Sequence, residues 1–445
     1  MFGHILQDMS ETKESERRKH SARFTGLSRR PFGLGSAWVL SGMTVFLVPS
    51  AVGEWDSEKY LVYSFGQLSL RPQLEVGETY DSNVFYSEKD EVSDFILSVR
   101  PGLSLFYGQK TENFISIRYT MDAAIYAERD DLDNLGHNFS HQSRFRLARW
   151  TLQGSDSFSI TKTLLGGNFS YVQKRIGLVS LTDLWRADYE ISQRLVVGAK
   201  VGFDLVDYDA LDLDQRFIYD YMGYNVGARV GYLPSDKIVV YPEFTFGQSF
   251  LEGNDSSMPK APDVDTYSIA AGAEGEFSPK LTGTISGGYE MRQYSDSSDI
   301  PNGWVADFQL RWQVRAKTTI SGGYRHFIQL SREARAIPYT AHRPTASVVQ
   351  ELGTKGQWTV AADAYYQFND YQGEFPDRDI EVPNSPVEYI MRTDEFLGFG
   401  FRAIWRWQPW LTFSGTYDFR KYADNMESIP DYDLHRFSIR ASAGY

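Results

Sequence analysis

The feature that most constrains this chain is a period-two alternation of apolar and polar residues that recurs from Gln67 onward. In residues 281–292, Leu, Gly, Ile, Tyr and Met alternate with Thr, Ser, Glu and Arg, and residues 358–369 and 433–445 show the same pattern. Successive side chains of a β-strand point to opposite faces, so this period predicts strands with one apolar and one polar face. The fold class predicted is all-β.

The length of the alternating segments selects among all-β folds. A soluble sandwich or propeller also has half-buried strands, but its strands average about five or six residues, whereas a tilted membrane strand needs about 9–11. The segments here run ten to sixteen residues, and no apolar run after residue 53 reaches the length of a spanning helix. Only a closed barrel satisfies every strand backbone group in lipid, so we expect a transmembrane antiparallel up-and-down β-barrel.

The segments predict eighteen strands, with sixteen as the alternative. Short connections such as 108–112, 234–236 and 278–279 alternate with long polar ones, which indicates short periplasmic turns and long extracellular loops. The strands are predicted near 67–80, 94–106, 113–126, 138–148, 150–161, 181–192, 195–208, 217–232, 237–250, 264–277, 280–294, 303–316, 317–330, 344–353, 357–371, 391–406, 410–422 and 433–445.

Residues 1–53 differ from the rest and are predicted to be an export signal peptide. A polar start is followed by Arg29 and Arg30, then by an apolar run from Ala37 to Val48. Ala51 and Gly53 suit positions −3 and −1 of a cut before Glu54. A membrane anchor is the alternative, but a spanning helix needs about 20 apolar residues and this run is shorter. Residues 54–66 would then be a short periplasmic N-terminal segment and 67–445 the barrel.

Composition excludes several functions. The 445 residues include no Cys, which removes disulfides, thiol catalysis and Cys-based zinc sites. With 45 Lys and Arg against 58 Asp and Glu, an acidic chain argues against a nucleic-acid partner. The leader holds seven basic and four acidic residues, so residues 54–445 carry 38 basic and 54 acidic side chains. No phosphate-binding glycine loop, metal-ligand set or cofactor motif is found, so no cofactor is expected.

Aromatic residues and the C-terminus indicate a bacterial outer-membrane location. Trp150, Tyr232, Trp312 and Trp405 lie at predicted strand ends, where aromatic rings meet lipid headgroups. The chain ends in a predicted strand whose last residue is Tyr445, an ending similar to the signal read by the barrel-assembly machinery. The expected partners are therefore outer-membrane lipids and that machinery.

The start of the predicted barrel resembles a known family. Leu70, Pro72 and Leu74 lead into the string Tyr-Asp-Ser-Asn-Val-Phe at 80–85, and Val-Arg-Pro-Gly-Leu follows at 99–103. These residues resemble the Putative beta-barrel porin 2 group of outer-membrane proteins, closely over about a quarter of the chain and by pattern over the rest. The resemblance implies an association with exopolysaccharide export and assigns no residue a role.

The polar face of each strand should line the lumen, and its charges differ from those of the whole chain. On our assignment the lumen holds eighteen basic and twelve acidic side chains, so most of the acidity belongs to the loops. The densest basic patch lies on the last three predicted strands. The candidate solute-binding residues are Arg402, Arg406, Arg420, Arg436, Arg440, Arg311, Arg315, Arg144 and Arg146.

The basic lumen permits two interpretations. Arginine rings in a pore favour anions, and guanidinium pairs with carboxylate in a fork, which predicts a porin or conduit for polar, anionic solutes such as an acidic polysaccharide. Alternatively, arginines pair with acids on neighbouring strands and only hold the wall in shape. Acidic loops at 128–133, 207–214 and 374–381 could bind divalent cations, but none has EF-hand spacing and we favour solvated loops.

Two other function classes remain as alternatives. An outer-membrane lipid-modifying enzyme would need a Ser and His pair, and only His326 of the five histidines after residue 53 is expected on the lipid face near the outer rim. No Gly-x-Ser-x-Gly elbow is present, so we predict no enzyme. The other alternative is a structural or adhesive barrel whose long loops plug the lumen.

Overall fold

The computed structural model describes residues 61–445, apart from several gaps. The signal peptide prediction and the cut before Glu54 lie outside the described residues, as does Tyr445. The gaps are 110–112, 164–174, 210–218, 254–261, 296–301, 332–336, 354–355, 378–387, 427–430 and 445.

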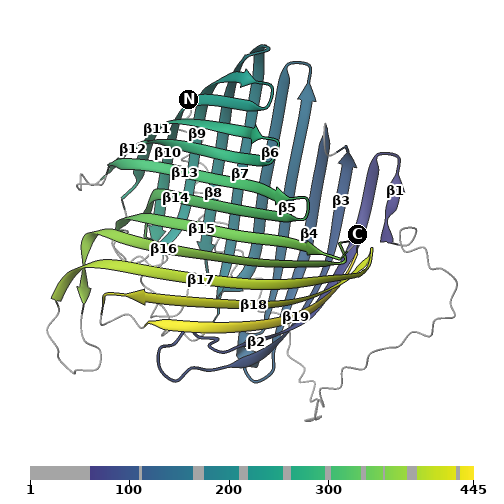
Figure 1. Ribbon diagram of the computed structural model, residues 1–445. Helices are drawn as coiled ribbons and strands as arrows, with labels where there is room; N and C mark the ends of the chain where they lie inside the picture. The colour runs from purple at the N-terminus through teal and green to yellow at the C-terminus, as the bar shows by residue number, and fades with distance from the viewer. Residues whose placement is uncertain are drawn as a thin grey trace, which may run out of the picture. The chain divides into compact units, whose positions relative to one another are not determined.

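The described chain is almost entirely β-strand (Figure 1). Apart from one short 3-10 helix at Asp130–Leu132, every regular element among the described residues is a strand. None of these residues forms a helix long and apolar enough to span a membrane. The strands are β1 (Tyr63–Phe65), β2 (Leu68–Asp81), β3 (Asp94–Gly108), β4 (Phe114–Tyr126), β5 (Asn134–Leu147), β6 (Trp150–Thr163), β7 (Ile176–Ser192), β8 (Leu195–Tyr208), β9 (Tyr219–Ser235), β10 (Ile238–Gly253), β11 (Val264–Ser278), β12 (Leu281–Tyr294), β13 (Gly303–Arg315), β14 (Thr318–Leu330), β15 (Pro338–Leu352), β16 (Trp358–Asp377), β17 (Glu388–Gln408), β18 (Leu411–Asp424) and β19 (Tyr432–Ala443).

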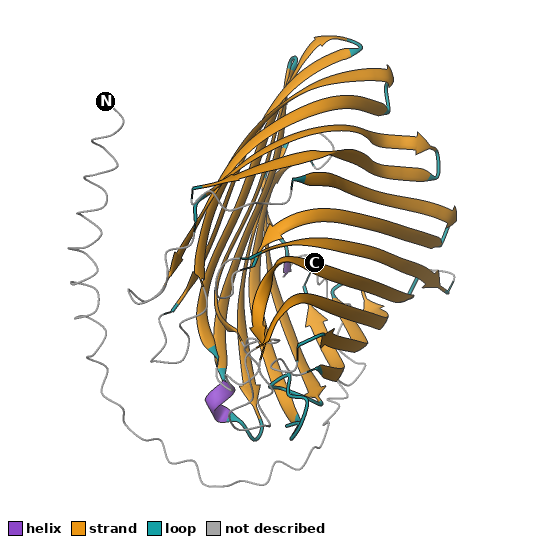
Figure 2. Ribbon diagram, turned by 90° about the vertical axis from the view of Figure 1, so that its left-hand side faces the viewer, coloured by secondary structure: helices purple, strands orange, loops and turns teal. Residues whose placement is uncertain are grey.

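Strands β2 to β19 form a closed antiparallel barrel. Each pairs with its neighbours in the chain, and β19 pairs with β2 from Arg436↔Asp81 to Ala443↔Leu74 (Figures 1 and 2). Closure gives every strand two hydrogen-bonded neighbours, which is what lipid requires of a sheet. The prediction of an eighteen-stranded transmembrane barrel is confirmed.

The extra strand β1 pairs with the periplasmic end of β2, next to the seam where β19 and β2 close the barrel. The pairing of β19 with β2 stops at Leu74, and β1 pairs with β2 at Leu68–Leu70 beyond that point. β1 lies in residues 54–66, which we had expected to be only a short periplasmic segment. β1 thereby pairs with backbone groups of β2 that β19 does not reach.

The connections separate into two ends of the barrel. Two-residue turns join β5 to β6, β7 to β8, β9 to β10, β11 to β12, β13 to β14 and β17 to β18 at one end. The connections after β2, β4, β6, β8, β10, β12, β14, β16 and β18 are longer. This asymmetry identifies the short-turn end as periplasmic and the long-loop end as extracellular.

Strand boundaries differ most from prediction at the extracellular end. β15 begins at Pro338 instead of residue 344, and Pro344 pairs with Tyr324 of β14 but has no partner in the β16 register. Proline lacks the N–H that a ladder needs, so the sequence suggested a boundary there. β16 and β17 remain paired up to Asp377↔Glu388, beyond the predicted ends of both strands, with a register shift between Asp370 and Glu374.

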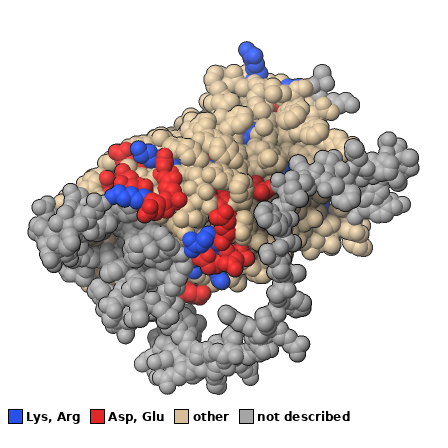
Figure 3. Space-filling model, turned by 90° about the horizontal axis from the view of Figure 1, so that it is seen from below, with Lys and Arg blue, Asp and Glu red and all other residues tan. Residues whose placement is uncertain are grey.

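The outward face carries large apolar side chains. Trp150, Phe244, Ile269 and Ile439 are among those exposed on it. Figure 3 shows most of the charged side chains on this face gathered in patches, while much of its remaining described surface carries none. An apolar outward surface of this kind is the part of a barrel that contacts lipid.

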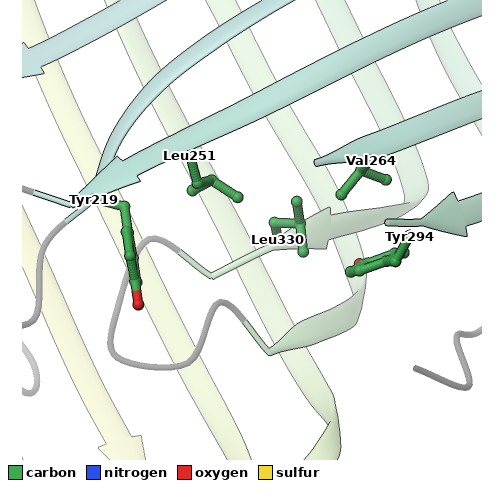
Figure 4. Close-up of a cluster of buried hydrophobic side chains, with 5 residues drawn as sticks. All are labelled: Tyr219, Leu251, Val264, Tyr294 and Leu330. Atoms are coloured by element: carbon green, nitrogen blue, oxygen red, sulfur yellow. The ribbon is translucent and has the colours of Figure 1, made fainter. Parts of the chain in front are cut away.

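Buried apolar clusters occur near the extracellular strand ends. One contains Tyr219, Leu251, Val264, Tyr294 and Leu330 (Figure 4). A second is built on Tyr371, Tyr422 and Met426, and a third on Val84, Phe85, Tyr126 and Leu132. The strand residues Tyr126, Tyr219, Tyr294 and Tyr422 have the parity of the inward face, so the extracellular part of the lumen is partly filled by side chains.

Gly398 gives a test of packing inside the barrel wall. A Cβ built there would lie 2.1 Å from the Tyr365 ring of the neighbouring strand, whereas one at Gly415 would meet nothing within 4 Å. We expect Gly398→Val to lower the free energy of unfolding by about 1–3 kcal/mol because the tyrosine must leave its position. Urea-dependent folding into lipid vesicles measures this. Gly415→Val is the matched control, and equal losses in both variants would contradict the packing.

Candidate functional site in the lumen

Strand register places eight of the nine predicted solute-binding arginines on the inward face. Arg402 follows the outward residue Phe401, and Arg311 lies between the outward residues Leu310 and Trp312, so their side chains have the opposite parity. The same argument applies to Arg144, Arg146, Arg406, Arg420, Arg436 and Arg440. Arg315 follows a register shift and pairs with Thr318, so register does not fix its face. Register thus gives the other eight a common face, but their surroundings divide them into two groups.

One wall of the lumen is a network of ion pairs across β7 to β11. Arg229 is 7% exposed and lies between Asp188, at 3.0 Å, and Glu274, at 2.7 Å. Arg186 lies 3.7 Å from both of these carboxylates, and Lys200 pairs with Glu243. We call Arg186, Asp188, Lys200, Arg229, Glu243 and Glu274 the wall network. Its charges are satisfied by their neighbours, as the structural interpretation of the lumen expected.

Two of the predicted site residues are also paired. Arg436 Nε donates to Asp81 Oδ2 at 2.6 Å and its guanidinium lies over the Tyr86 ring. Arg440 Nε lies 3.7 Å from Glu75, which also accepts a hydrogen bond from Arg100 at 2.8 Å. The dense basic patch predicted on the last three strands is therefore partly neutralised by acids from β2. Sequence could not show this because β2 and β19 meet only when the barrel closes.

A second set of arginines has no carboxylate partner among the described residues. They lie on β2, β4, β5, β13 and β17, within six residues of the periplasmic ends of those strands. Most are exposed to the lumen, and Nε of Arg71 and of Arg144 has no hydrogen-bond partner. We call this set the arginine belt: Arg71, Arg118, Arg144, Arg146, Arg311, Arg315, Arg402 and Arg406.

The belt borders a recess in the periplasmic part of the lumen. The recess has a volume of about 430 Å³ and is lined by Glu75, Arg100, Arg118, Thr120 and Ser442, among others. Arg100 is held by Glu75 and by Asp122 at 2.9 Å, which leaves Arg118 as the unpaired cation of this lining. A smaller recess of about 240 Å³ includes Arg343, whose guanidinium lies over the Tyr365 ring. We had missed Arg343 because the predicted strand began after it.

The periplasmic turns add a basic rim that we did not predict. Five two-residue turns end in a basic residue, and each of these is exposed. The carbonyl of each basic turn residue accepts a backbone hydrogen bond from the next hairpin, as Lys237 does from Glu276. The sequence signal for this rim is a dipeptide ending in Lys or Arg, which recurs between alternating segments. The basic rim consists of Arg149, Arg194, Lys237, Lys280 and Lys317.

Inward polar residues near the extracellular end are tightly packed. Arg392 is 1% exposed and donates to Asp394 at 2.7 Å and to the Tyr422 hydroxyl at 3.0 Å. The Tyr371 hydroxyl donates to the other oxygen of Asp394 at 2.8 Å. Arg420, a predicted site residue, is exposed on the same strand as Tyr422 and has no carboxylate partner among the described residues. The packed groups are satisfied by each other, whereas Arg420 is exposed.

All five histidines of the described chain lie on the outward face, so the expectation that only His326 does so is wrong. His137, His342 and His435 each bond through Nδ1 to a tyrosine hydroxyl on a neighbouring strand, at 2.8–2.9 Å. His326 is buried, and its ring stacks on Trp304 with centroids 3.7 Å apart. Its Nδ1 has no hydrogen-bond partner among the described residues.

In the described acidic loop at 128–133, carboxylates accept hydrogen bonds from nearby residues of the chain. Arg129 bonds to Asp131 at 2.7 Å and thereby lowers the pKa of that carboxyl below its usual value. Asp133 accepts the Tyr126 amide. Across the described residues no group of three His, Cys, Asp or Glu side chains could hold a metal ion. The loops at 207–214 and 374–381 lie largely outside the described residues.

Stability measurements can separate the two kinds of arginine. Arg229→Met should lower the free energy of unfolding by about 3–5 kcal/mol because Asp188 and Glu274 would lose their buried partner. Arg402→Met should change it by less than about 0.5 kcal/mol because no carboxylate depends on Arg402. Urea-dependent folding in lipid vesicles gives both values. A loss for Arg402→Met as large as that for Arg229→Met would show that belt arginines also hold the wall together.

Comparisons with known proteins give one family and several distant structural neighbours. No curated protein sequence matches the chain significantly. Among solved structures, the siderophore receptor PirA from Pseudomonas aeruginosa is 9% identical with a TM-score of 0.44, over 84% of this chain and 80% of that one. OccAB3 from Acinetobacter baumannii is 10% identical with a TM-score of 0.42, over 84% and 99%. The family model for Putative beta-barrel porin 2 matches residues 63–436, so this chain belongs to that family and is an outer-membrane barrel protein of the porin type.

Proposed function

We propose that this protein is a conduit through the bacterial outer membrane for polar anionic solutes, with acidic polysaccharide as the substrate class. The observation that carries the proposal is the arginine belt. Its eight guanidinium groups have no carboxylate partner among the described residues, and register directs all but that of Arg315 into the lumen. The wall network, by contrast, is neutralised internally. Unpaired cations along a pore attract anions.

The chemistry of the belt favours carboxylate or phosphate groups spaced along a chain. A guanidinium group presents donors in a planar fork that matches both groups, and it stays charged at all physiological pH values. Arg402 and Arg406 lie four residues apart on one strand, and Arg311 and Arg315 repeat this spacing on another. Residues four apart on a strand are separated by about 13 Å. A polyanion of several sugar units could therefore contact more than one of them.

The position of the belt favours binding from the periplasm. The arginine belt lies in the periplasmic part of the barrel, and the basic rim lines that mouth along the turns from β5 to β14. Clefts lined by one sign of charge raise the local concentration of counter-ions. At the extracellular end, by contrast, side chains such as Tyr219 and Tyr422 are buried in apolar clusters. We propose that the solute is collected at the periplasmic mouth and that the extracellular end opens to release it.

The same apolar clusters support a second candidate. A barrel whose extracellular end is filled could be structural or adhesive and conduct nothing. The absence of ion current through the purified barrel under any voltage would favour that function over transport. Assembly in the membrane is proposed to use the barrel-assembly machinery and surrounding outer-membrane lipids.

Current block by an acidic oligosaccharide tests the conduit. In a planar bilayer, an oligomer of galacturonic acid should reduce the current more strongly from the periplasmic side, and a neutral oligomer of equal length should not. Replacing Arg311, Arg315, Arg402 and Arg406 with Gln should weaken the block by at least about tenfold, because one charged hydrogen bond contributes about 1.5–3 kcal/mol.

Two controls accompany this experiment. Lys162→Gln with Lys421→Gln removes exposed cations on the outward face and should leave the block unchanged. Because the chain has no cysteine, Ala316→Cys in a periplasmic turn reports the orientation through a membrane-impermeant thiol reagent. An equal block from both sides would show that the solute is not collected at the periplasmic mouth. A block insensitive to the four substitutions would show that the arginine belt does not bind it.

A further inference from the structure

Three ionisable side chains occupy the outward face in the middle of β5, β6 and β7. Register pairs His141 with Asp156 and Asp156 with Asp183, so the three lie in a row across adjacent strands. His141 Nδ1 lies 2.5 Å from Asp156 Oδ2. Their parity is that of the exposed residues Phe139, Trp150 and Ile160. We call His141, Asp156 and Asp183 the outer polar cluster.

The depth of this cluster places it inside the lipid. Asp156 lies six residues along β6 from Trp150, whose exposed ring marks the periplasmic interface. With a rise of about 3.4 Å per residue and a tilt of about 40°, this corresponds to roughly 15 Å, near the centre of an apolar band about 25 Å tall. Carboxylates at this depth on a lipid-facing surface are costly and indicate function.

The barrel satisfies the cluster only in part. The Trp185 indole stacks on the His141 ring with centroids 5.7 Å apart and interacts with both carboxyl groups. Oδ1 of Asp156 and Oδ1 of Asp183 remain buried without a hydrogen-bond partner among the described residues. The two carboxyl groups also interact with each other across the strands. The side chains of His141 and Asp156 nevertheless remain partly exposed on the outward face. The row therefore presents an imidazole and a carboxyl group to whatever surface covers it.

Small residues surround the cluster on the same face. Gly154 lies under the Trp185 ring, where a Cβ would be 2.8 Å from it. On the periplasmic side, Ala187 pairs with Ala199, which pairs with Ala228 of β9. Small side chains allow another protein surface to approach closely within a membrane. The polar row and the small residues beside it form one patch.

A catalytic role for this patch is disfavoured by geometry. Ser143 shares the outward face with His141 and Asp156, the residue types of a nucleophile, a base and an acid. Its hydroxyl is buried and has no hydrogen-bond partner among the described residues. The patch also lies near the bilayer centre, whereas the ester groups of lipids lie at the interface. We therefore look for a protein occupant.

We propose that the patch docks a second copy of this chain in the membrane. The patch is self-complementary because it carries both an imidazole donor and carboxylate acceptors. Two identical patches brought together by a twofold axis along the membrane normal can exchange hydrogen bonds between the imidazole of one copy and the carboxylates of the other. Twofold contacts of this isologous kind are the commonest in protein oligomers. Contact also removes the polar row from lipid.

Disulfide cross-linking of the full-length protein in outer membranes tests this proposal. The chain contains no cysteine, so Ala187→Cys places a single thiol at the edge of the patch, and Ala362→Cys places one on the outward face of β16. Mild oxidation should give a band of twice the monomer mass for Ala187→Cys and none for Ala362→Cys. Adding Asp156→Leu and Asp183→Leu to Ala187→Cys should lower the yield by about tenfold or more.

Folding is checked separately in the same samples. The Asp156→Leu and Asp183→Leu barrel should retain its heat-dependent shift in gel mobility, since leucine suits a lipid-facing position. Native mass spectrometry of the unmodified protein in nanodiscs should show a dimer that this variant lacks. The proposal would be overturned if mass spectrometry showed only monomer and the two cysteine variants cross-linked equally. A cross-link from Ala187→Cys to a protein of different mass would also overturn it.

Discussion

The whole structure depends on one constraint, which is that lipid offers no hydrogen bond to a strand edge. β2 to β19 meet it by closing on themselves, and β1 continues the pairing where β19 ends. Closure fixes register, and register fixes which side chains face lipid and which face the lumen. Every functional statement about this protein follows from that division of each strand into two faces.

The lumen uses its charges for two purposes. Arg229 and its acidic partners join β7, β9 and β11 and leave little charge available to a solute. Arg118, Arg311 and Arg402 instead face the lumen near its periplasmic mouth and have no carboxylate partner in the described part of the chain. The structural interpretation of the basic lumen therefore accounts for the wall network, and the proposed anion pathway concerns the arginine belt. The acidity of the whole chain does not describe the surface that a solute meets.

The alternating pattern was sufficient to predict a barrel with eighteen strands as the first of two alternatives, and the inward position of eight of the nine arginines. It could not identify which arginines are paired, because Arg436 meets Asp81 only across the closing seam. It also could not place the start of β15, where Pro338 and Pro344 resemble a loop. The outer polar cluster was hidden for a related reason. His141 and Asp183 are 42 residues apart in sequence and become neighbours of Asp156 only through register.

The zero-current potential of the purified barrel across a salt gradient shows whether the unpaired guanidinium groups set the field that a permeating ion meets. With potassium chloride at unequal concentrations on the two sides of a bilayer, we expect a potential whose sign shows that chloride crosses more readily than potassium. Higher salt should reduce this preference because screening shortens the range of the field. A clear preference for potassium would show that the guanidinium groups do not set the field.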